Sequence, residues 1–167
     1  IGGEENLSAW QASHDYTNES FRSSLRKSIE AAWMRDKILT ELPSTAEQVH
    51  AQQILLYNRE TAEDIQSKLQ SGAKFGDLAS AYDPNTNGEL GWFPRNYLLE
   101  KNIEDAAFSL EIGLPSDIIE TEVGFHIIMV LEKETERPLS PDALLVLQEK
   151  ALLDWLANAR ETSKIEK

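Results

Sequence analysis

A chain of 167 residues with 41% hydrophobic residues can bury a core, so wholesale disorder is excluded. The absence of cysteine excludes disulfides, thiolate metal sites and a cysteine nucleophile. The net charge of −13 comes mainly from residues 49–136, where 16 acidic side chains face 6 basic ones, so this segment lacks the basic surface that nucleic acids and phosphorylated substrates require.

The first part of the chain is predicted to be helical. A short helix is expected at residues 7–14, and Thr17 or Asn18 is the predicted N-cap of a longer one. One face of this longer helix is marked by apolar residues at helical spacing: Phe21, Leu25, Ile29, Ala32 and Leu39. The residues at 42–45 are expected to end it, because they include Pro43.

The middle part alternates between strand and helix patterns. A strand is predicted at 49–57, helices at 61–70 and 75–82, and a turn at 83–88 that leads into a strand at 89–93. A helix at 103–110 and strands at 118–122 and 125–131, joined at Gly124, complete the series. This order predicts a small sheet with helices around it.

The last part is predicted to be one helix. Ser140 at the cap and Pro141 at the first helical position mark its start. Its apolar face is wide enough to need a partner surface. Two interpretations stay open: the flanking helices pack on each other or on the middle domain, or they form a groove for unfolded chains or a dimer interface.

Five ordered motifs in the middle part resemble the parvulin (PpiC-like) family of peptidyl-prolyl isomerases. They are His50-Ala51-Gln52-Gln53-Ile54-Leu55, Phe75-Gly76-Asp77-Leu78-Ala79, Gly88-Glu89-Leu90-Gly91-Trp92-Phe93, Glu104-Asp105-Ala106-Ala107-Phe108 and Gly124-Phe125-His126-Ile127-Ile128. The resemblance covers about half of the chain. It implies an α+β fold of the FKBP-like kind, with a four-stranded antiparallel sheet wrapped by helices and further helices at both ends.

The resemblance also implies three parts of the chain. Residues 1–48 are expected to form a chaperone-like helical segment, and residues 49–136 the isomerase domain. Residues 137–167 are expected to form a C-terminal helix that packs with the N-terminal helices. This order of parts is similar to that of bacterial extracytoplasmic foldases.

The catalytic residues that the resemblance implies are His50, Asp83, Thr121 and His126. His50 and His126 are expected to form a hydrogen-bonded pair at the sheet centre, Thr121 to join their network, and Asp83 to face the reacting amide. The implied substrate-binding residues are Leu90, Phe93, Leu98, Leu99, Ile103 and Phe108. No metal ion or cofactor is implied.

Two departures from the family pattern affect this site. Gln53 stands where a second histidine is common in the first motif, and the histidine pair is expected to form without it. The segment at 96–103 is one residue longer than usual and lacks the family's methionine, which leaves open whether Leu98 or Leu99 takes that place.

We therefore expect an isomerase and foldase that acts non-covalently on X-Pro bonds of unfolded or secreted polypeptides, with no specificity for phosphorylated residues and no nucleic acid partner. The alternative is a catalytically weak parvulin-like chaperone or oligomerisation module. A homodimer through the flanking helices is a further expectation. The resemblance to secretion foldases predicts a location outside the cytoplasm, with any signal or membrane anchor upstream of Ile1.

Overall fold

The computed structural model describes residues 3–162. Its elements follow in the predicted order: α1 (Glu4–Ser13), α2 (Asn18–Thr40), β1 (Thr45–Leu56), α3 (Arg59–Gln70), α4 (Phe75–Tyr82), β2 (Glu89–Pro94), α5 (Lys101–Ser109), β3 (Ile119–Glu120), β4 (Phe125–Pro138) and α6 (Pro141–Thr162). None of these described helices combines the length and the apolar character that crossing a membrane requires.

The chain divides into two compact units. One holds the residues up to Leu42 together with those from Ala151 onward, and the other is Pro43–Lys150. Within the first unit, α2 begins with a capping box, because the Thr17 hydroxyl accepts from the Ser20 N–H and the Ser20 hydroxyl accepts from the Thr17 N–H. This decides between the two predicted caps in favour of Thr17.

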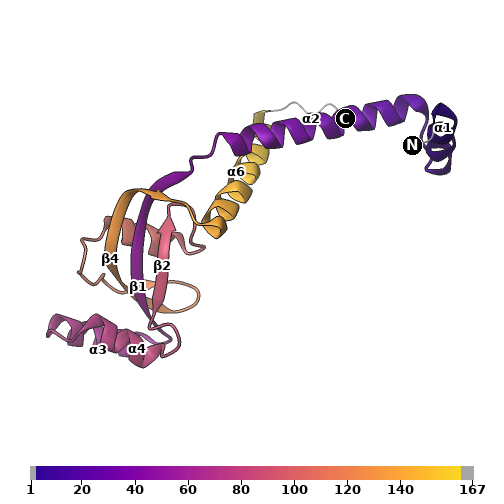
Figure 1. Cartoon of the computed structure of the whole chain (residues 1–167). Helices are drawn as coiled ribbons and strands as arrows, with labels where there is room; N and C mark the ends of the chain where they lie inside the picture. The colour runs from indigo at the N-terminus through magenta and orange to yellow at the C-terminus, as the bar shows by residue number, and fades with distance from the viewer. Residues whose placement is uncertain (1–2, 163–167) are drawn as a thin grey trace. The chain divides into compact units, whose positions relative to one another are not determined.

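The second unit is built on a four-stranded antiparallel sheet in the order β2-β1-β4-β3 (Figure 1). Strands β1 and β4 pair from Thr45 opposite Pro138 to Leu56 opposite Phe125. The pairing continues before Val49, where β1 was predicted to begin, since β4 extends far enough to pair with those residues. The predicted α+β fold with an antiparallel four-stranded sheet is confirmed.

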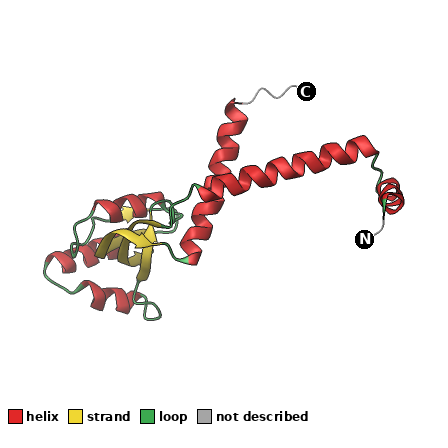
Figure 2. Cartoon of the chain, turned by 45° about the horizontal axis from the view of Figure 1, so that its top comes forward, coloured by secondary structure: helices red, strands yellow, loops and turns green. Residues whose placement is uncertain are grey.

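Each face of the sheet carries its own apolar cluster, because side chains alternate along a strand. Figure 2 shows helices on both sides of the sheet. The cluster on the α5 side is made of buried Val49, Ala51, Phe93, Ile103, Ala107, Ile128 and Val130. The cluster on the α3 and α4 side is made of buried Ile54, Leu56, Ala62, Ile65, Phe75, Ala79 and Ile127. Polar side chains can therefore meet only if they point to the same face of the sheet.

Candidate functional site

Three polar side chains meet on the α5 side of the sheet, and we call them the polar triad: Gln53, Thr121 and His126. The His126 Nδ1 atom lies 3.1 Å from Gln53 Oε1, and its Nε2 atom lies 2.9 Å from Thr121 Oγ1. Gln53 comes from β1 and His126 from β4, while Thr121 lies in the turn between β3 and β4. That turn is closed by a hydrogen bond from the Thr121 N–H to the Gly124 carbonyl, 2.8 Å long.

Burial favours the neutral form of the His126 ring. Only 4% of the residue is exposed, and this burial lowers the pKa of His126 below 6.5, an effect that the Glu100 carboxylate opposes. Gln53 Oε1 is an acceptor, so we assign the ring proton to Nδ1, which leaves Nε2 to accept from the Thr121 hydroxyl. The neutral ring therefore holds the Gln53 side-chain oxygen in place.

The lowered pKa of His126 predicts acid sensitivity. Stability that depends on the neutral ring is fully present above pH 6.5, the ordinary pKa, and is lost as the pH falls below that value, because the unfolded chain then binds the proton more readily. Denaturation of the wild type and of His126→Gln between pH 8 and 5.5 checks this. The wild type should lose more stability over this range, and equal slopes for the two proteins would contradict the expectation.

His50 lies on the opposite face of the sheet. It is the register partner of Trp92 and of Glu132, and its ring stacks on that of Trp92 with centroids 5.3 Å apart. Its Nε2 atom is 2.5 Å from Glu89 Oε1, and its Nδ1 atom is 3.3 Å from Glu132 Oε1. The expected hydrogen-bonded pair of His50 and His126 is therefore wrong.

The residue that sequence reasoning missed is Gln53, which takes the place expected for His50 beside His126. Three positions separate Gln53 from His50, an odd number, so the two side chains point to opposite faces of β1. Gln53 is also the position where the first motif departs from its usual second histidine. That departure, together with strand alternation, is the signal that could have identified it.

An apolar surface adjoins the polar triad, and we call its members Leu90, Leu98, Ile103 and Phe108 the apolar pocket. Ile119, the register partner of His126, packs against the same cluster and so connects pocket and triad. Leu90, Leu98 and Phe108 are partly exposed, whereas Ile103 is 4% exposed. Phe93 is fully buried, and its ring lies edge-on to Phe108 at 6.2 Å, so it supports the pocket from beneath.

Leu98 and Leu99 differ in their surroundings. Leu98 packs against the buried cluster, while Leu99 is fully exposed. The side chain that completes the pocket is thus Leu98. Leu99, which was included among the expected binding residues, has no place in it.

A buried carboxylate, for which the sequence predicted no role, holds Leu98 in position. Glu104 is 3% exposed and its Oε1 atom accepts from the Asn96 N–H at 2.8 Å. Its Oε2 atom accepts from the N–H groups of Tyr97 and Leu98 at 3.0 and 3.2 Å. The backbone of Asn96 has a positive φ of 67°, so this turn is held in a conformation that needs such support.

Asp83 is the C-cap residue of α4, and its hydrogen-bond partners lie in the turn that follows rather than in the polar triad. Its carboxylate accepts from the N–H groups of Asn85 and Thr86, at 3.1 and 3.2 Å, and from the Thr86 hydroxyl. These hydrogen bonds, that of the Thr86 hydroxyl first, lower the pKa of Asp83 below 3.8. Asp83 and Gln53 line one hollow of about 260 Å³, so Asp83 is a neighbour of the site rather than a member of the triad.

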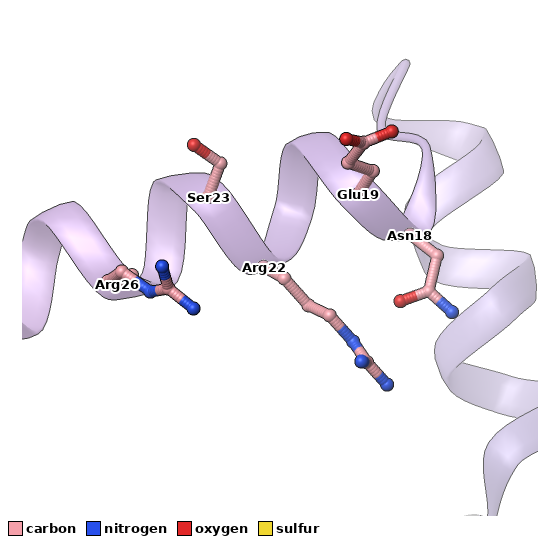
Figure 3. A pocket seen from close by; sticks show the side chains of 5 residues that line it. All are labelled: Asn18, Glu19, Arg22, Ser23 and Arg26. Atoms are coloured by element: carbon pink, nitrogen blue, oxygen red, sulfur yellow. The ribbon is translucent and has the colours of Figure 1, made fainter.

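A hollow in the first unit does not qualify as a catalytic site. It has a volume of about 550 Å³ and is lined by Asn18, Glu19, Arg22, Ser23 and Arg26. All five residues belong to α2, and Figure 3 shows Glu19 and Ser23 pointing away from Asn18 and Arg22. Because these groups diverge, they cannot converge on a reacting atom. Among the described residues no group of His, Cys, Asp or Glu is arranged to hold a metal ion.

Comparison with known proteins finds a family match and a set of relatives. The model of the family described as PPIC-type PPIASE domain matches residues 36–134. The foldase protein PrsA of Geobacillus sp. (strain WCH70) is 40% identical over 97 residues, which cover 55% of this chain and 35% of that protein. The foldase protein PrsA of Oceanobacillus iheyensis is 35% identical over 128 residues, which cover 72% of this chain and 42% of that protein.

Solved structures resemble this chain over nearly its whole length. The match to a peptidylprolyl isomerase (PrsA) from Bacillus cereus covers 98% of this chain and 71% of the Bacillus cereus chain. It has a TM-score of 0.59 and 24% sequence identity. The match to a peptidylprolyl isomerase (PrsA) from Bacillus anthracis has a TM-score of 0.52 at 21% sequence identity. It covers 98% of this chain and 84% of the Bacillus anthracis chain. At these identities the likeness concerns the fold. The chain spans about a third of the length of the first curated relatives, 30% to 35%.

Proposed function

Because this chain belongs to the family of PPIC-type PPIase domains, we propose that it catalyses the cis–trans isomerisation of X-Pro bonds in other polypeptides. The observation that carries the proposal is the joint placement of the polar triad and the apolar pocket on one face of the sheet. An apolar pocket can hold a proline ring, and the neighbouring polar groups can act on the amide that precedes it.

The reaction requires no bond to break. The trans form is favoured by only about 0.5–1 kcal/mol, but rotation faces a barrier of roughly 18–20 kcal/mol because the C–N bond has partial double-bond character. A catalyst must therefore bind the twisted amide more tightly than either planar form. Leu90, Leu98 and Ile103 would hold the ring while the amide turns.

Gln53 is the residue suited to recognise the twisted amide. His126 binds its side-chain oxygen, which leaves the Nε2 amide group as a donor. A planar amide nitrogen is a poor acceptor, but it gains a lone pair as resonance is lost during rotation. A hydrogen bond from Gln53 Nε2 to that nitrogen would form mainly in the twisted state, which is the condition for catalysis.

Isomerisation of a short X-Pro peptide, measured by a chymotrypsin-coupled assay, tests the proposal. Leu98→Ala should lower kcat/KM about tenfold, since a partly buried leucine contributes roughly 1.5 kcal/mol to an apolar pocket. Leu99→Ala, at the fully exposed neighbour, is the matched control and should retain the wild-type value. Cis–trans isomerisation no faster than in buffer would refute the proposed activity. Equal losses of kcat/KM for the two variants would refute the proposed role of the pocket in binding proline.

The proposed substrates are unfolded or secreted polypeptides that contain proline, without a requirement for phosphorylation. Both arginines near the site already have acidic partners, because Arg59 pairs with Glu120 and Arg95 pairs with Asp105 at 2.7 Å. An anionic group on the substrate would have to displace these carboxylates. This arrangement supports recognition through apolar contacts.

The flanking helices are proposed to hold unfolded chains or a second copy of this chain. Supporting this, α2 exposes Leu25, Ile29 and Trp33, which are 49%, 60% and 62% exposed. The same surface would serve the alternative function, a weakly active chaperone or oligomerisation module. We retain three functional parts at residues 1–48, 49–136 and 137–167, and a location outside the cytoplasm, as parts of the proposal.

A further inference from the structure

One arginine connects two walls of the apolar pocket. Arg95 follows β2 and lies in the turn that leads to Leu98, whereas Phe108 belongs to α5. The guanidinium carbon of Arg95 lies 4.1 Å from the centre of the Phe108 ring, so the guanidinium group stacks over this ring. The Arg95 Nη1 atom also donates to Asp105 Oδ1 at 2.7 Å. The turn and the helix are therefore tied together through Arg95.

The sequence of α5 places both partners of Arg95 side by side. Asp105 and Phe108 are three residues apart, and residues with this spacing lie on the same side of a helix. A guanidinium group suits such a pair, because it can bind the carboxylate while its flat face covers the ring. Lys101 contacts the other carboxylate oxygen, Oδ2, at 3.3 Å, which leaves Oδ1 of Asp105 to Arg95.

The Phe108 side chain is held from several directions. Its backbone carbonyl accepts from the Lys133 Nζ atom at 2.9 Å, which fixes the end of α5. The Phe93 ring meets the Phe108 ring edge-on, with centroids 6.2 Å apart. Because Phe93 is fully buried and Arg95 is exposed, these two contacts hold the ring from the protein side and from the solvent side. Arg95 is therefore the contact that keeps this wall of the pocket from moving outward.

We propose that Arg95 is a positioning residue that determines the ring size of the substrate. By holding Phe108 and the turn of Leu98 at a fixed separation, it fits the apolar pocket to the five-membered ring of proline. The inference rests on the proposed isomerase function. A wall that is held in place cannot move aside for an additional methylene group, and one methylene group in a fitted apolar pocket changes specificity by about tenfold or more.

Two peptides that differ only in ring size test the proposal. One contains an X-Pro bond, and the other has pipecolic acid, the six-membered homologue, in place of proline. NMR exchange spectroscopy measures the catalysed cis–trans isomerisation of both. The wild type should favour the proline peptide by about tenfold or more in kcat/KM. Arg95→Ala should lower this ratio by about threefold to fivefold, because it removes an exposed ion pair and a cation–π contact.

Arg95→Lys and Arg137→Lys form a matched pair of variants. Arg95→Lys keeps a charge that can pair with Asp105 but loses the flat group over the ring, so the ratio should fall as in Arg95→Ala. Arg137 makes the same kinds of contact on the opposite face of the sheet. Its guanidinium carbon lies 4.0 Å from the centre of the Trp92 ring, and its Nη1 atom lies 2.7 Å from Glu134 Oε1. Arg137→Lys should therefore keep the wild-type ratio.

The outcomes separate the role of Arg95 from the proposed function. Isomerisation with equal ratios for the wild type and Arg95→Lys, with a wild-type ratio near one, or with an equal fall in Arg137→Lys overturns the role and leaves the function standing. Failure to accelerate either peptide overturns the function. The dissociation constants of the two peptides, from NMR titration, then decide the role, and an unchanged preference for the proline peptide in Arg95→Lys rejects it.

Discussion

Replacing Gly88 with alanine is expected to lower the free energy of unfolding by about 3 kcal/mol or more, because an overpacked backbone contact and a strained backbone conformation add. Gly88 has a φ of +72°, which side chains with a Cβ rarely adopt. A Cβ at this position would lie 2.0 Å from the Gln53 carbonyl oxygen, so the backbone itself must move. Chemical denaturation followed by circular dichroism measures the loss.

The same substitution should also reduce isomerase activity in the molecules that remain folded. The Gly88 carbonyl accepts from the Gln53 N–H at 2.8 Å, and Gln53 is the triad residue proposed to contact the amide. Gly76→Ala is the control, because this glycine lies inside α4 and a methyl group added to it would meet nothing within 4 Å. It should stabilise the protein by up to about 1 kcal/mol. Similar destabilisation by both variants would contradict the steric argument.

The second large effect is expected for Glu104→Gln, with a loss of about 2 kcal/mol in the free energy of unfolding. Hydrogen bonds to charged groups contribute roughly 1.5–3 kcal/mol. In the variant, the NH₂ group of glutamine would replace one carboxylate oxygen, so a backbone N–H group would face a donor in place of its acceptor. Since the three N–H groups belong to Asn96, Tyr97 and Leu98, the turn should loosen. Leu98 would then no longer complete the pocket, and kcat/KM should fall as well.

Asp105→Asn is the control for Glu104→Gln, because it also removes one negative charge from α5 but at an exposed position. Asp105 follows Glu104 on α5 and pairs with Arg95 and Lys101 at the surface, where removal of an ion pair costs about 1 kcal/mol or less. Thermal unfolding and peptide isomerisation of the two variants are the measurements. If Asp105→Asn is the more damaging change in both, the assigned role of Glu104 is wrong.

The order of elements could be predicted because each pattern is local. Strand alternation, helical spacing and the turn residues around Gly88 and Gly124 depend on neighbours in the sequence. The start of β1 could not be predicted, since Thr45 belongs to the strand only through its pairing with Pro138 on β4. Pairing of this kind depends on residues about 90 positions later in the sequence, at the end of β4.

The candidate site could be predicted only where its contacts are local in the sequence. The contact of Thr121 with His126 is present, because those residues lie five positions apart in one hairpin. The partner of His126 across the sheet depends on which residues of β1 face the α5 side, and this placed Gln53 there in place of His50. Glu104 opens the fourth motif, but its role could not be predicted because a glutamate is usually exposed, and only the turn packed over it makes its burial favourable.

The pairing of β1 with β4 has a consequence for how the chain folds during synthesis. Strand β1 is made early, and its partner along its whole length, from Thr45 opposite Pro138 to Leu56 opposite Phe125, is made last in the domain. Loops of this length close slowly, and an unpaired apolar strand is prone to aggregate meanwhile. A nascent chain that has emerged only as far as β3 therefore lacks β4, one of the two central strands of its sheet, together with His126, and β1 stays unpaired along that edge until translation supplies β4.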